Sequence, residues 1–350
     1  MTGPGILMSA SDDPMRLESA YFRYMRDAGA DVRGWTTASR PTMATPTLAA
    51  RIARRLFPGR QQAELGRDLI AHVEAESPEV LFLFKGMDIR PATLRAIRDR
   101  GVRLVNYNAD HPLEYFSRGS GNANVRDAIP FYDLYVTYSD NIARQLRAAH
   151  PDLAVGVVPF GHEVDEARFQ RISGEDEVVR ACFLGNPDAQ RVAAIRTLAD
   201  AGIAVDVYGF DWPKFLAPGP LVTVHGPLHG DAMMAALRRY RLQLNVFRPH
   251  NADSHNMRSF EVPACGGIML AEDSSEHRRF FEAGKEAFYF GDPATMVEGA
   301  RHLMALSAGE ADAIRTAARA RTVASGYHYA DRARTMWDLI MALPAKKDIR

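Results

Sequence analysis

Short apolar runs alternate with segments of helical periodicity along most of the chain. Ile6-Leu7-Met8 predicts a strand, and apolar side chains from Leu17 to Ala28 then recur at helical spacing until Gly29. The run Val80–Phe84 is apolar at every position, which is typical of a strand buried on both faces. Strands that alternate with helices build parallel sheets covered by helices on both faces. The pattern therefore predicts an α/β protein.

The alternation is interrupted once, by a polar segment between two similar halves. Residues 162–177 are rich in charged side chains. Strands are expected before it at 102–107, 134–137 and 155–158, and after it at 178–184, 203–208, 221–224, 242–247, 268–271 and 287–290. We expect two domains at 1–165 and 178–329 and a linker at 166–177. A closing amphipathic helix is expected at 330–350, able to pack back on the first domain.

The composition supports two globular domains and narrows the range of partners. The chain has 350 residues, of which 47% are hydrophobic and 25% are charged, as in ordinary soluble proteins. The 43 Lys and Arg residues balance the 43 Asp and Glu residues, so no overall field attracts a polynucleotide. We therefore exclude nucleic acid as the main partner, and we expect any anion site to be local.

The two cysteines fit a reducing compartment, and the short apolar runs argue against a signal peptide and a membrane helix. Cys182 and Cys265 lie in apolar runs and are too few for a disulfide framework or a zinc site. We see no signal peptide, and no stretch reaches the ~18 apolar residues of a membrane helix. We expect a cytoplasmic protein without a transmembrane segment. Membrane contact would be peripheral, through a basic amphipathic helix near 51–57, although a solvated helix face is the simpler interpretation of that segment.

The loops that leave the carboxyl ends of parallel strands are the first places to look for a site, because open sheets bind ligands there. After the strand at 178–184, Gly185 and Asn186 open a turn whose amides could hold a phosphate. Arg191 follows near the start of the next helix and could pair with the same phosphate. An ordinary turn with a solvated arginine is the alternative.

The loop after the strand at 242–247 is denser in hydrogen-bonding side chains. It leads into an apolar helix that carries Arg258, Ser259 and Glu261. Ser259 could cap the helix or bind an anion, and Arg258 could meet a diphosphate there. Glu261 is a carboxylate on an otherwise apolar element, so it needs polar partners, which sugar hydroxyls would supply. A capping-box or salt-bridge glutamate is the competing interpretation.

Three segments of the second half together resemble a known family. The segments 258–267, 280–290 and 326–332 are similar to the C-terminal signature of group 1 glycosyltransferases, most of all to the branch that contains the spore-maturation CgeB-type proteins. The resemblance implies the GT-B fold, in which two Rossmann-like, doubly wound parallel-sheet domains face a cleft. It also implies that the second domain holds a nucleotide-sugar donor and that the first holds an acceptor.

The resemblance also implies roles for further residues. Many relatives carry a Glu-x7-Glu pair: the second glutamate, which matches Glu261, binds the donor ribose, and the first, which is Asp253 here, approaches the sugar. The shorter side chain of Asp253 departs from that pattern. In the first half, Asn108–Pro112 resembles the family's Asp-x-Pro loop. There Asp110 or His111 could be the general base for the acceptor hydroxyl if transfer inverts the anomeric centre, whereas a retaining reaction needs none. A turn in which Asp110 satisfies loop amides is the alternative.

The leaving diphosphate must be met by positive charge, and the usual carboxylate clamp for a metal is missing. No Asp-x-Asp triplet occurs in the chain, so we expect arginines and helix amides to replace the metal, with Lys214 and Arg248 as lesser candidates. The hypothesis is a glycosyltransferase that uses a nucleoside-diphosphate sugar and no cofactor. A non-catalytic nucleotide-sugar sensor and a nucleotide-sugar epimerase are the alternatives. The loops at 41–60 and 116–126 are expected to recognise the acceptor, which could be a glycan, a lipid-linked group or a protein.

Overall fold

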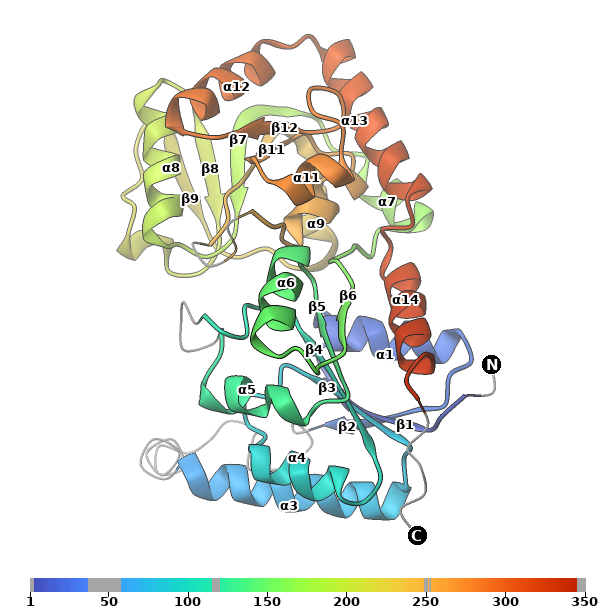
Figure 1. Ribbon diagram of the computed structural model, residues 1–350. Helices are drawn as coiled ribbons and strands as arrows, with labels where there is room; N and C mark the ends of the chain where they lie inside the picture. The colour runs from blue at the N-terminus through green and yellow to red at the C-terminus, as the bar shows by residue number, and fades with distance from the viewer. Residues whose placement is uncertain (1–2, 37–57, 115–119, 249–250, 252, 345–350) are drawn as a thin grey trace. The chain divides into compact units, whose positions relative to one another are not determined.

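The computed structural model describes residues 3–36, 58–114, 120–248, 251 and 253–344. The chain forms two compact units. The first combines Met1–Pro159 with Tyr329–Arg350, and the second is Phe160–His328. Each unit is built around one parallel β-sheet (Figure 1).

The first unit contains a six-stranded sheet in the order β2-β1-β3-β4-β5-β6. Its strands are β1 (Ile6–Ala10), β2 (Val32–Thr36), β3 (Val80–Phe84), β4 (Arg103–Asn108), β5 (Leu134–Thr137) and β6 (Val155–Val157). Its helices are α1 (Leu17–Asp27), α3 (Pro58–Glu76), α4 (Pro91–Arg98), α5 (Ala123–Ala128), α6 (Asp140–Ala149) and α14 (Tyr329–Met341), with a 3-10 turn η1 (Ile129–Phe131). The strand order reverses between β1 and β3. Open α/β sheets bind ligands at such a switch point.

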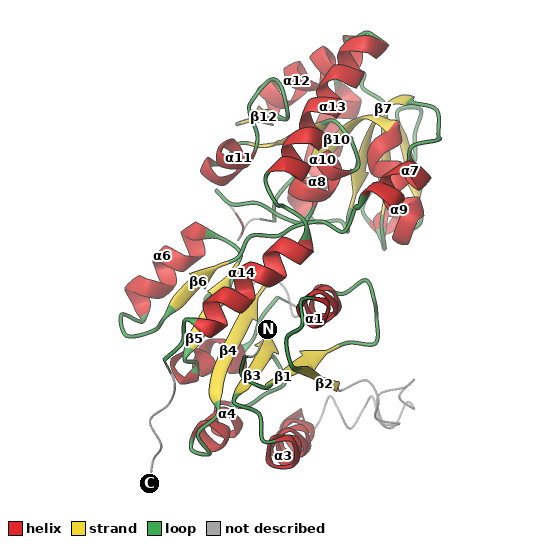
Figure 2. Cartoon of the chain, turned by 90° about the vertical axis from the view of Figure 1, so that its right-hand side faces the viewer, coloured by secondary structure: helices red, strands yellow, loops and turns green. Residues whose placement is uncertain are grey.

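Helices cover both faces of the first sheet, and the last helix of the chain belongs to this unit. Figure 2 shows α14 beside α1, against which it packs. Tyr21 of α1 is fully buried, and its ring centroid lies 6.0 Å from that of Tyr329 and 5.5 Å from that of Tyr107. Burying an aromatic side chain of this kind contributes about 2–3 kcal/mol, so these rings help to fix α14 on the first unit.

The second unit contains a six-stranded sheet in the order β12-β11-β10-β7-β8-β9. Its strands are β7 (Val178–Leu184), β8 (Val205–Tyr208), β9 (Val222–His225), β10 (Tyr240–Asn245), β11 (Met269–Glu272) and β12 (Phe288–Phe290). Its helices are α7 (Glu166–Ile172), α8 (Ala189–Asp200), α9 (Gly230–Arg239), α10 (Arg258–Ala264), α11 (Ser275–Phe280), α12 (Pro293–Ala305) and α13 (Ala308–Ala324), with a 3-10 turn η2 (Trp212–Lys214). Here the order reverses between β7 and β10, so the loops after these two strands meet.

The core of the second unit lies between its sheet and the helices α8 and α12. Phe183, Leu242 and Leu270 of the sheet pack in one buried cluster with Ile195 of α8 and Leu303 of α12. Successive residues of a strand point to opposite faces, so the neighbours of these apolar residues face the other side. The face of the sheet that packs on α8 and α12 therefore carries this core.

The structure contains every strand that the hydrophobic pattern predicts, with ends that shift by one or two residues. It adds β2, an edge strand whose sequence includes a charged residue and a glycine and therefore gives a weak apolar signal. The expected linker at 166–177 is corrected, because α7 occupies much of it and belongs to the second unit. The units divide between Pro159 and Phe160 instead. The amphipathic helix expected near 51–57 lies outside the described residues.

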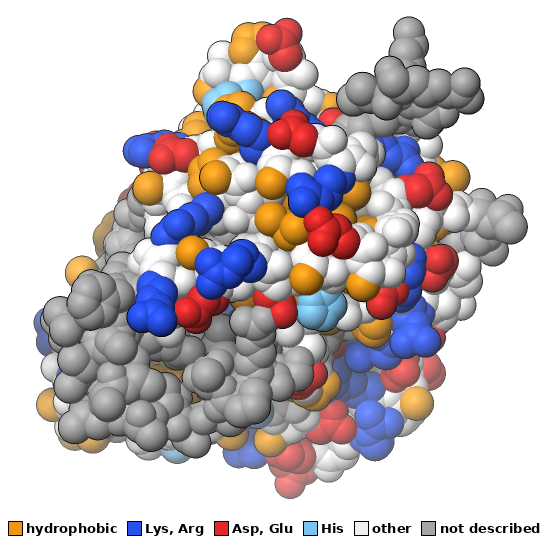
Figure 3. All heavy atoms as spheres, turned by 90° about the horizontal axis from the view of Figure 1, so that it is seen from below, with side chains coloured by type: hydrophobic (Ala, Val, Ile, Leu, Met, Phe, Trp, Pro, Cys, Tyr) orange, Lys and Arg blue, Asp and Glu red, His pale blue; other side chains and the backbone are white. Residues whose placement is uncertain are grey.

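The surface carries charges of both signs. On the face shown in Figure 3, Lys and Arg side chains are interspersed with Asp and Glu side chains. Cys182 and Cys265 are both buried and unlinked, and burial raises the pKa of each thiol. Among the helices that the structure describes, none is both long and apolar enough to cross a bilayer.

Candidate functional site

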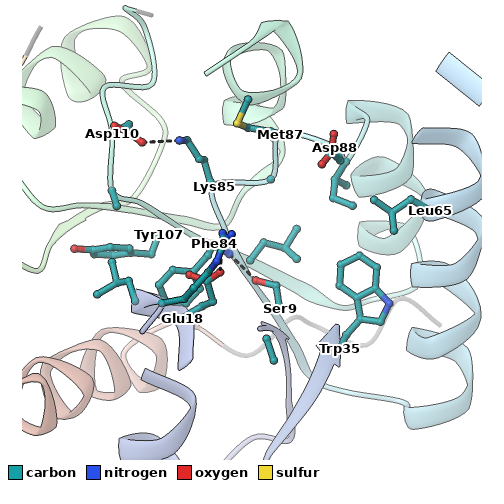
Figure 4. A pocket seen from close by; sticks show the side chains of 17 residues that line it. Ser9, Glu18, Trp35, Leu65, Phe84, Lys85, Met87, Asp88, Tyr107 and Asp110 are labelled. Carbon is teal, nitrogen blue, oxygen red and sulfur yellow. Dashed lines mark hydrogen bonds and ion pairs between the residues drawn. The ribbon is translucent and has the colours of Figure 1, made fainter. Parts of the chain in front are cut away.

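A pocket of about 390 Å³ opens at the switch point of the first sheet. Residues that follow or end β1, β2, β3 and β4 line it, together with the start of α1. Figure 4 shows Trp35 and Leu65 on one side of the pocket and Tyr107 and Asp110 on the opposite side. The charged lining residues are Arg16, Glu18, Lys85, Asp88 and Asp110. The size and mixed polarity of this pocket suit a small polar ligand.

Lys85 enters this pocket from a strained turn after β3. The φ angle is 61° at Lys85 and 81° at Gly86, so both residues adopt the left-handed conformation that lysine ordinarily avoids. The Lys85 amide donates to the Tyr107 carbonyl over 2.9 Å, and the Gly86 amide donates to the Phe84 carbonyl over 2.7 Å. The turn directs the ammonium group to Asp110, whose Oδ2 lies 2.5 Å from Nζ (Figure 4). Strain of this kind is concentrated at functional sites.

Asp110 and His111, the two candidates of the first unit, have different surroundings. The Asp110 carboxylate lines the pocket. His111 is buried, and its Nδ1 accepts from the amides of Leu113 and Glu114 over 3.3 and 3.1 Å. Burial also lowers the pKa of His111, so the imidazole is neutral and the amides occupy its lone pair. His111 therefore holds the turn, and Asp110 is one of the three carboxylates that line the pocket, with Glu18 and Asp88.

In the second unit, Arg191 joins the loops that meet at the switch point. Its Nη1 donates to the Asn186 carbonyl over 3.0 Å, and its Nε and Nη2 donate to the Val246 carbonyl over 3.4 and 3.3 Å. Its guanidinium also pairs with Asp188, the N-cap residue of α8, at 3.3 Å. The side chain is only 12% exposed. Arg191 thus braces this edge of the sheet and adds a positive charge to it.

Gly185 lies where two loops pack closely. Its amide donates to the Tyr208 carbonyl over 2.9 Å, and its carbonyl accepts from Nε1 of Trp212 over 2.8 Å. The neighbouring Asn186 accepts the amide of Phe210 on Oδ1 over 3.2 Å. The Gly185 amide is therefore engaged within the protein, and the phosphate contact predicted for it is not open in this structure.

Arg258 and Glu261 form an ion pair one turn apart in α10. Nη1 of Arg258 contacts Oε2 of Glu261. The Glu261 side chain is 6% exposed and the Arg258 side chain is 25% exposed. Nε of Arg258 is buried and has no hydrogen-bond partner among the described residues. The two predicted residues are thus together, and one buried donor atom of the arginine is left without a partner in the described structure.

Ser259 anchors α10 from inside the unit. Its hydroxyl lies 2.7 Å from Nε2 of His277 and accepts from Nδ2 of Asn245 and from the Asn256 amide. Its own amide donates to Oδ1 of Asn256 over 3.2 Å. Nδ1 of His277 donates to the Glu272 carbonyl over 2.8 Å, so Nε2 accepts the hydroxyl proton of Ser259. The hydroxyl and the amide of Ser259 are therefore both hydrogen-bonded within the protein, so neither is available for the predicted contact with an anion.

His277 and Glu272 form a supporting layer that the sequence did not indicate. The His277 ring stacks between Phe247 and Tyr289, with centroid distances of 5.0 and 5.6 Å. Burial lowers the pKa of His277 to about 4, so the ring is neutral near pH 7. The Glu272 carboxylate accepts from the Phe247 amide and from Nε2 of Gln190, and burial raises its pKa. These contacts hold the loop after β10 and the start of α10 in place.

Asp253, at the position of the family's first glutamate, has a structural contact. Its φ angle is 53°, and its Oδ1 accepts from the Ser275 amide at the start of α11 over 2.8 Å. The side chain is exposed. The carboxylate thus caps α11 in this structure, and a contact with a sugar stays a prediction.

Arginines and carboxylates lie together at the switch point of the second sheet, where Asp188 and Glu272 act on Arg191 as well as Arg248 and Arg258. Desolvation is the largest cause that lowers the pKa of Arg191, and repulsion from Arg248 and Arg258 lowers it further. Arg248 and Arg258 are therefore electrostatic neighbours of Arg191. Lys214, in contrast, is 70% exposed and pairs with Asp211. Within the described residues, no group of three His, Cys, Asp or Glu side chains is placed to hold a metal ion.

Comparisons with known proteins fit this arrangement. Residues 190–338 match a family model described as glycosyl transferase-like, a match that spans Arg191, Arg258 and Glu261. No relative is found among curated protein sequences.

Solved structures resemble the chain over nearly its whole length. Sucrose-phosphate synthase from Thermosynechococcus elongatus has a TM-score of 0.70 at 12% identity, with 96% of this chain and 97% of that chain covered. HepE from Anabaena in complex with UDP-glucose has a TM-score of 0.65 at 12% identity, with 97% and 100% covered. UDP-GlcNAc 2-epimerase from Neisseria meningitidis, bound to UDP-GlcNAc, has a TM-score of 0.58 at 11% identity, with 96% and 98% covered. The fold is therefore of the two-domain α/β GT-B type, as the sequence resemblance implied.

Proposed function

We propose that this protein is a glycosyltransferase that moves a sugar from a nucleoside-diphosphate donor to an acceptor hydroxyl. The observation that carries the proposal is the match of residues 190–338 to a glycosyl transferase-like family, because this segment contains the Arg258 and Glu261 pair. GT-B neighbours determined with UDP-glucose or UDP-GlcNAc support a nucleotide-sugar ligand. The branch with CgeB-type proteins remains our assignment from the sequence.

The second unit would hold the donor. We assign the ribose hydroxyls to Glu261 and the diphosphate to Arg258, whose side chain is partly exposed at 25%. Arg191 and Arg248 would add positive charge as the diphosphate leaves, because Arg191 is an electrostatic neighbour of both Arg248 and Arg258. Preorganised positive groups stabilise developing negative charge most strongly where water is excluded. This arrangement would serve without a bound metal.

The first unit would hold the acceptor in the pocket at its own switch point. In an inverting reaction, Asp110 takes the proton of the acceptor hydroxyl, the hydroxyl oxygen bonds to the anomeric carbon, and the bond from that carbon to the diphosphate breaks with its electron pair on the diphosphate. Lys85 keeps the Asp110 carboxylate oriented through the 2.5 Å ion pair. In a retaining reaction the donor phosphate takes the proton instead, and Asp110 only positions the acceptor.

Nucleotide titration followed by a turnover assay tests this proposal. We expect one of UDP, GDP and dTDP to bind in calorimetry, and the corresponding nucleotide sugars to be consumed with an acceptor present at a rate that EDTA does not change. Binding without consumption across an acceptor panel would show a sensor. Conversion of the donor sugar without acceptor would show an epimerase, and either result would contradict the proposed transfer.

A further inference from the structure

A second pocket lies in the second unit, among residues that the proposed donor site does not use. It has a volume of about 730 Å³ and is bounded by α7, α13 and the end of α9. Phe169 of α7, Arg238 of α9, and Arg315 and Arg319 of α13 line it. Arg319 contacts α10 only at its last residue, Ala264, and neither Arg258 nor Glu261 lines this pocket, so a ligand here would be separate from the donor.

Three guanidinium groups converge on this pocket. Arg319 lies over the Phe169 ring at 3.5 Å, and Arg238 lies over the same ring at 5.1 Å. Arg319 donates to Glu166 and to the Ala264 carbonyl, and Arg315 pairs with Glu177. Arg238 differs from them, because within the described chain its guanidinium has no ion pair or hydrogen bond, and its contact is the aromatic ring. One cationic group of the pocket therefore lacks an anionic partner.

The charges that line the pocket do not cancel. Three arginines and two carboxylates, those of Glu166 and Asp312, line the pocket. Glu177, outside the lining, pairs with both Arg315 and Arg241, so four arginines stand against three carboxylates and one positive charge is left. Both lining carboxylates are at the exposed margin, with side chains 69% and 71% accessible, whereas the Arg315 and Arg319 side chains are only 9% and 12% accessible. A partly buried cation without a partner costs free energy, and an anion would offset that cost. Desolvation, followed by repulsion from Arg315, lowers the pKa of Arg238, which agrees with this imbalance.

The remaining lining is apolar. The Phe169 ring contacts both guanidinium groups, and Ala320, Val323 and Ala324 of α13 continue the wall. Val323 is 61% exposed, which is high for a large apolar residue. A guanidinium presents parallel N–H donors that match a phosphate or a carboxylate. The pocket thus offers a charged fork beside a surface for an apolar group.

We propose that this pocket binds a small organic oxyanion, a phosphate or carboxylate attached to an aromatic or apolar body, with Arg238 as the group that pairs with it. The volume lies within the range of pockets that bind small molecules. The proposal does not depend on the glycosyl transfer proposed above.

Titration with phenyl phosphate tests the proposal. The protein is titrated without added nucleotide, binding is followed by calorimetry, and the dependence on Arg238 distinguishes this pocket from the proposed donor site. We expect one saturable site, with affinity lowered about tenfold or more in Arg238→Gln because a charge-assisted pair contributes roughly 1.5–3 kcal/mol. Arg238→Lys keeps the charge without the fork and should bind with intermediate affinity.

Arg98→Gln is the matched control, because Arg98 is also a half-exposed arginine over a phenylalanine ring, that of Phe131 at 5.5 Å, in the other unit. This control should bind like the unchanged protein. The proposal fails if phenyl phosphate shows no saturable binding, or if Arg238→Gln and Arg98→Gln bind it equally well. Sedimentation with phosphatidylcholine vesicles that contain phosphatidic acid distinguishes a soluble phosphate from a lipid headgroup. If the vesicles bind in an Arg238-dependent way and phenyl phosphate does not bind, the ligand is a lipid headgroup and the proposed small ligand is wrong.

Discussion

At the residue scale, Arg258 and Glu261 of the candidate site neutralise each other's charge in an ion pair. A buried carboxylate is costly unless it is paired, and Glu261 is almost fully buried next to Arg258. A nucleoside diphosphate could offer hydroxyls to the carboxylate and phosphate oxygens to the guanidinium, so both charges would stay satisfied on binding. The ion pair with Arg258 explains how a carboxylate is tolerated on an apolar helix, and the contact of both residues with a donor stays a proposal.

The strained backbone of Lys85 leads to a prediction about stability. A left-handed residue with a Cβ costs about 1 kcal/mol relative to glycine. Lys85→Gly and Lys85→Ala both lose the ion pair with Asp110, but only the glycine variant relieves the backbone. We expect Lys85→Gly to be more stable than Lys85→Ala by roughly 1 kcal/mol in urea denaturation.

The comparison of the two Lys85 variants cancels the lost ion pair, so it isolates the backbone contribution. Equal stabilities would show that the turn after β3 is not strained. If transfer inverts the anomeric centre, both variants should also turn over the donor more slowly, because Asp110 loses the group that orients it.

At the scale of elements, α10 depends on a buried polar layer. Ser259 and Asn256 hold the first turn of α10. Nε2 of His277 accepts a hydrogen bond from the Ser259 hydroxyl only while the imidazole ring is neutral. The pKa of His277 is lowered from 6.5 to about 4 by burial. Between these two pH values the unfolded chain binds a proton that the folded protein does not. Stability contributed by neutral His277 is therefore present above pH 6.5 and is lost as the pH falls towards 4.

Titration of His277 by NMR tests this description of the layer. The imidazole carbon signals of His277 should shift with a midpoint near pH 4, and the free energy of unfolding should decrease as the pH falls from 6.5 to 4. The loss from this group amounts to roughly 3 kcal/mol at most. A midpoint near pH 6.5 would mean that the ring is solvated and that the layer does not support α10.

The elements could be predicted from the sequence more fully than the site. Apolar runs are local signals, so every strand except β2 was predicted from them, and the loops after β7 and β10 were identified because site loops follow the ends of parallel strands. Residues that converge from different elements leave no such local signal. His277 and Glu272 are not part of any recognisable sequence motif. Lys85 has a left-handed backbone conformation, which lysine does not favour, so the sequence does not indicate that turn. The predicted uses of Gly185 and Ser259 differed from the structure because their polar groups meet partners from distant segments.

At the scale of the whole molecule, the chain repeats one design in two units. Each unit has a six-stranded parallel sheet whose strand order reverses once. In the first unit a pocket with Lys85 and Asp110 lies at the reversal, and in the second unit the reversal brings together Arg191, Arg258 and Glu261. The division of labour that we propose, acceptor in the first unit and donor in the second, assigns one substrate to each switch point.

The affinity of Glu261→Ala for the nucleoside diphosphate tests the central claim most directly. Loss of charge-assisted hydrogen bonds to the ribose, worth roughly 1.5–3 kcal/mol, should weaken binding about 10- to 100-fold in calorimetry. Glu298→Ala, which removes an exposed carboxylate of α12, should bind like the unchanged protein. Folding of both variants is checked by thermal denaturation. Unchanged affinity in a folded Glu261→Ala variant would contradict the assignment of this site to the donor.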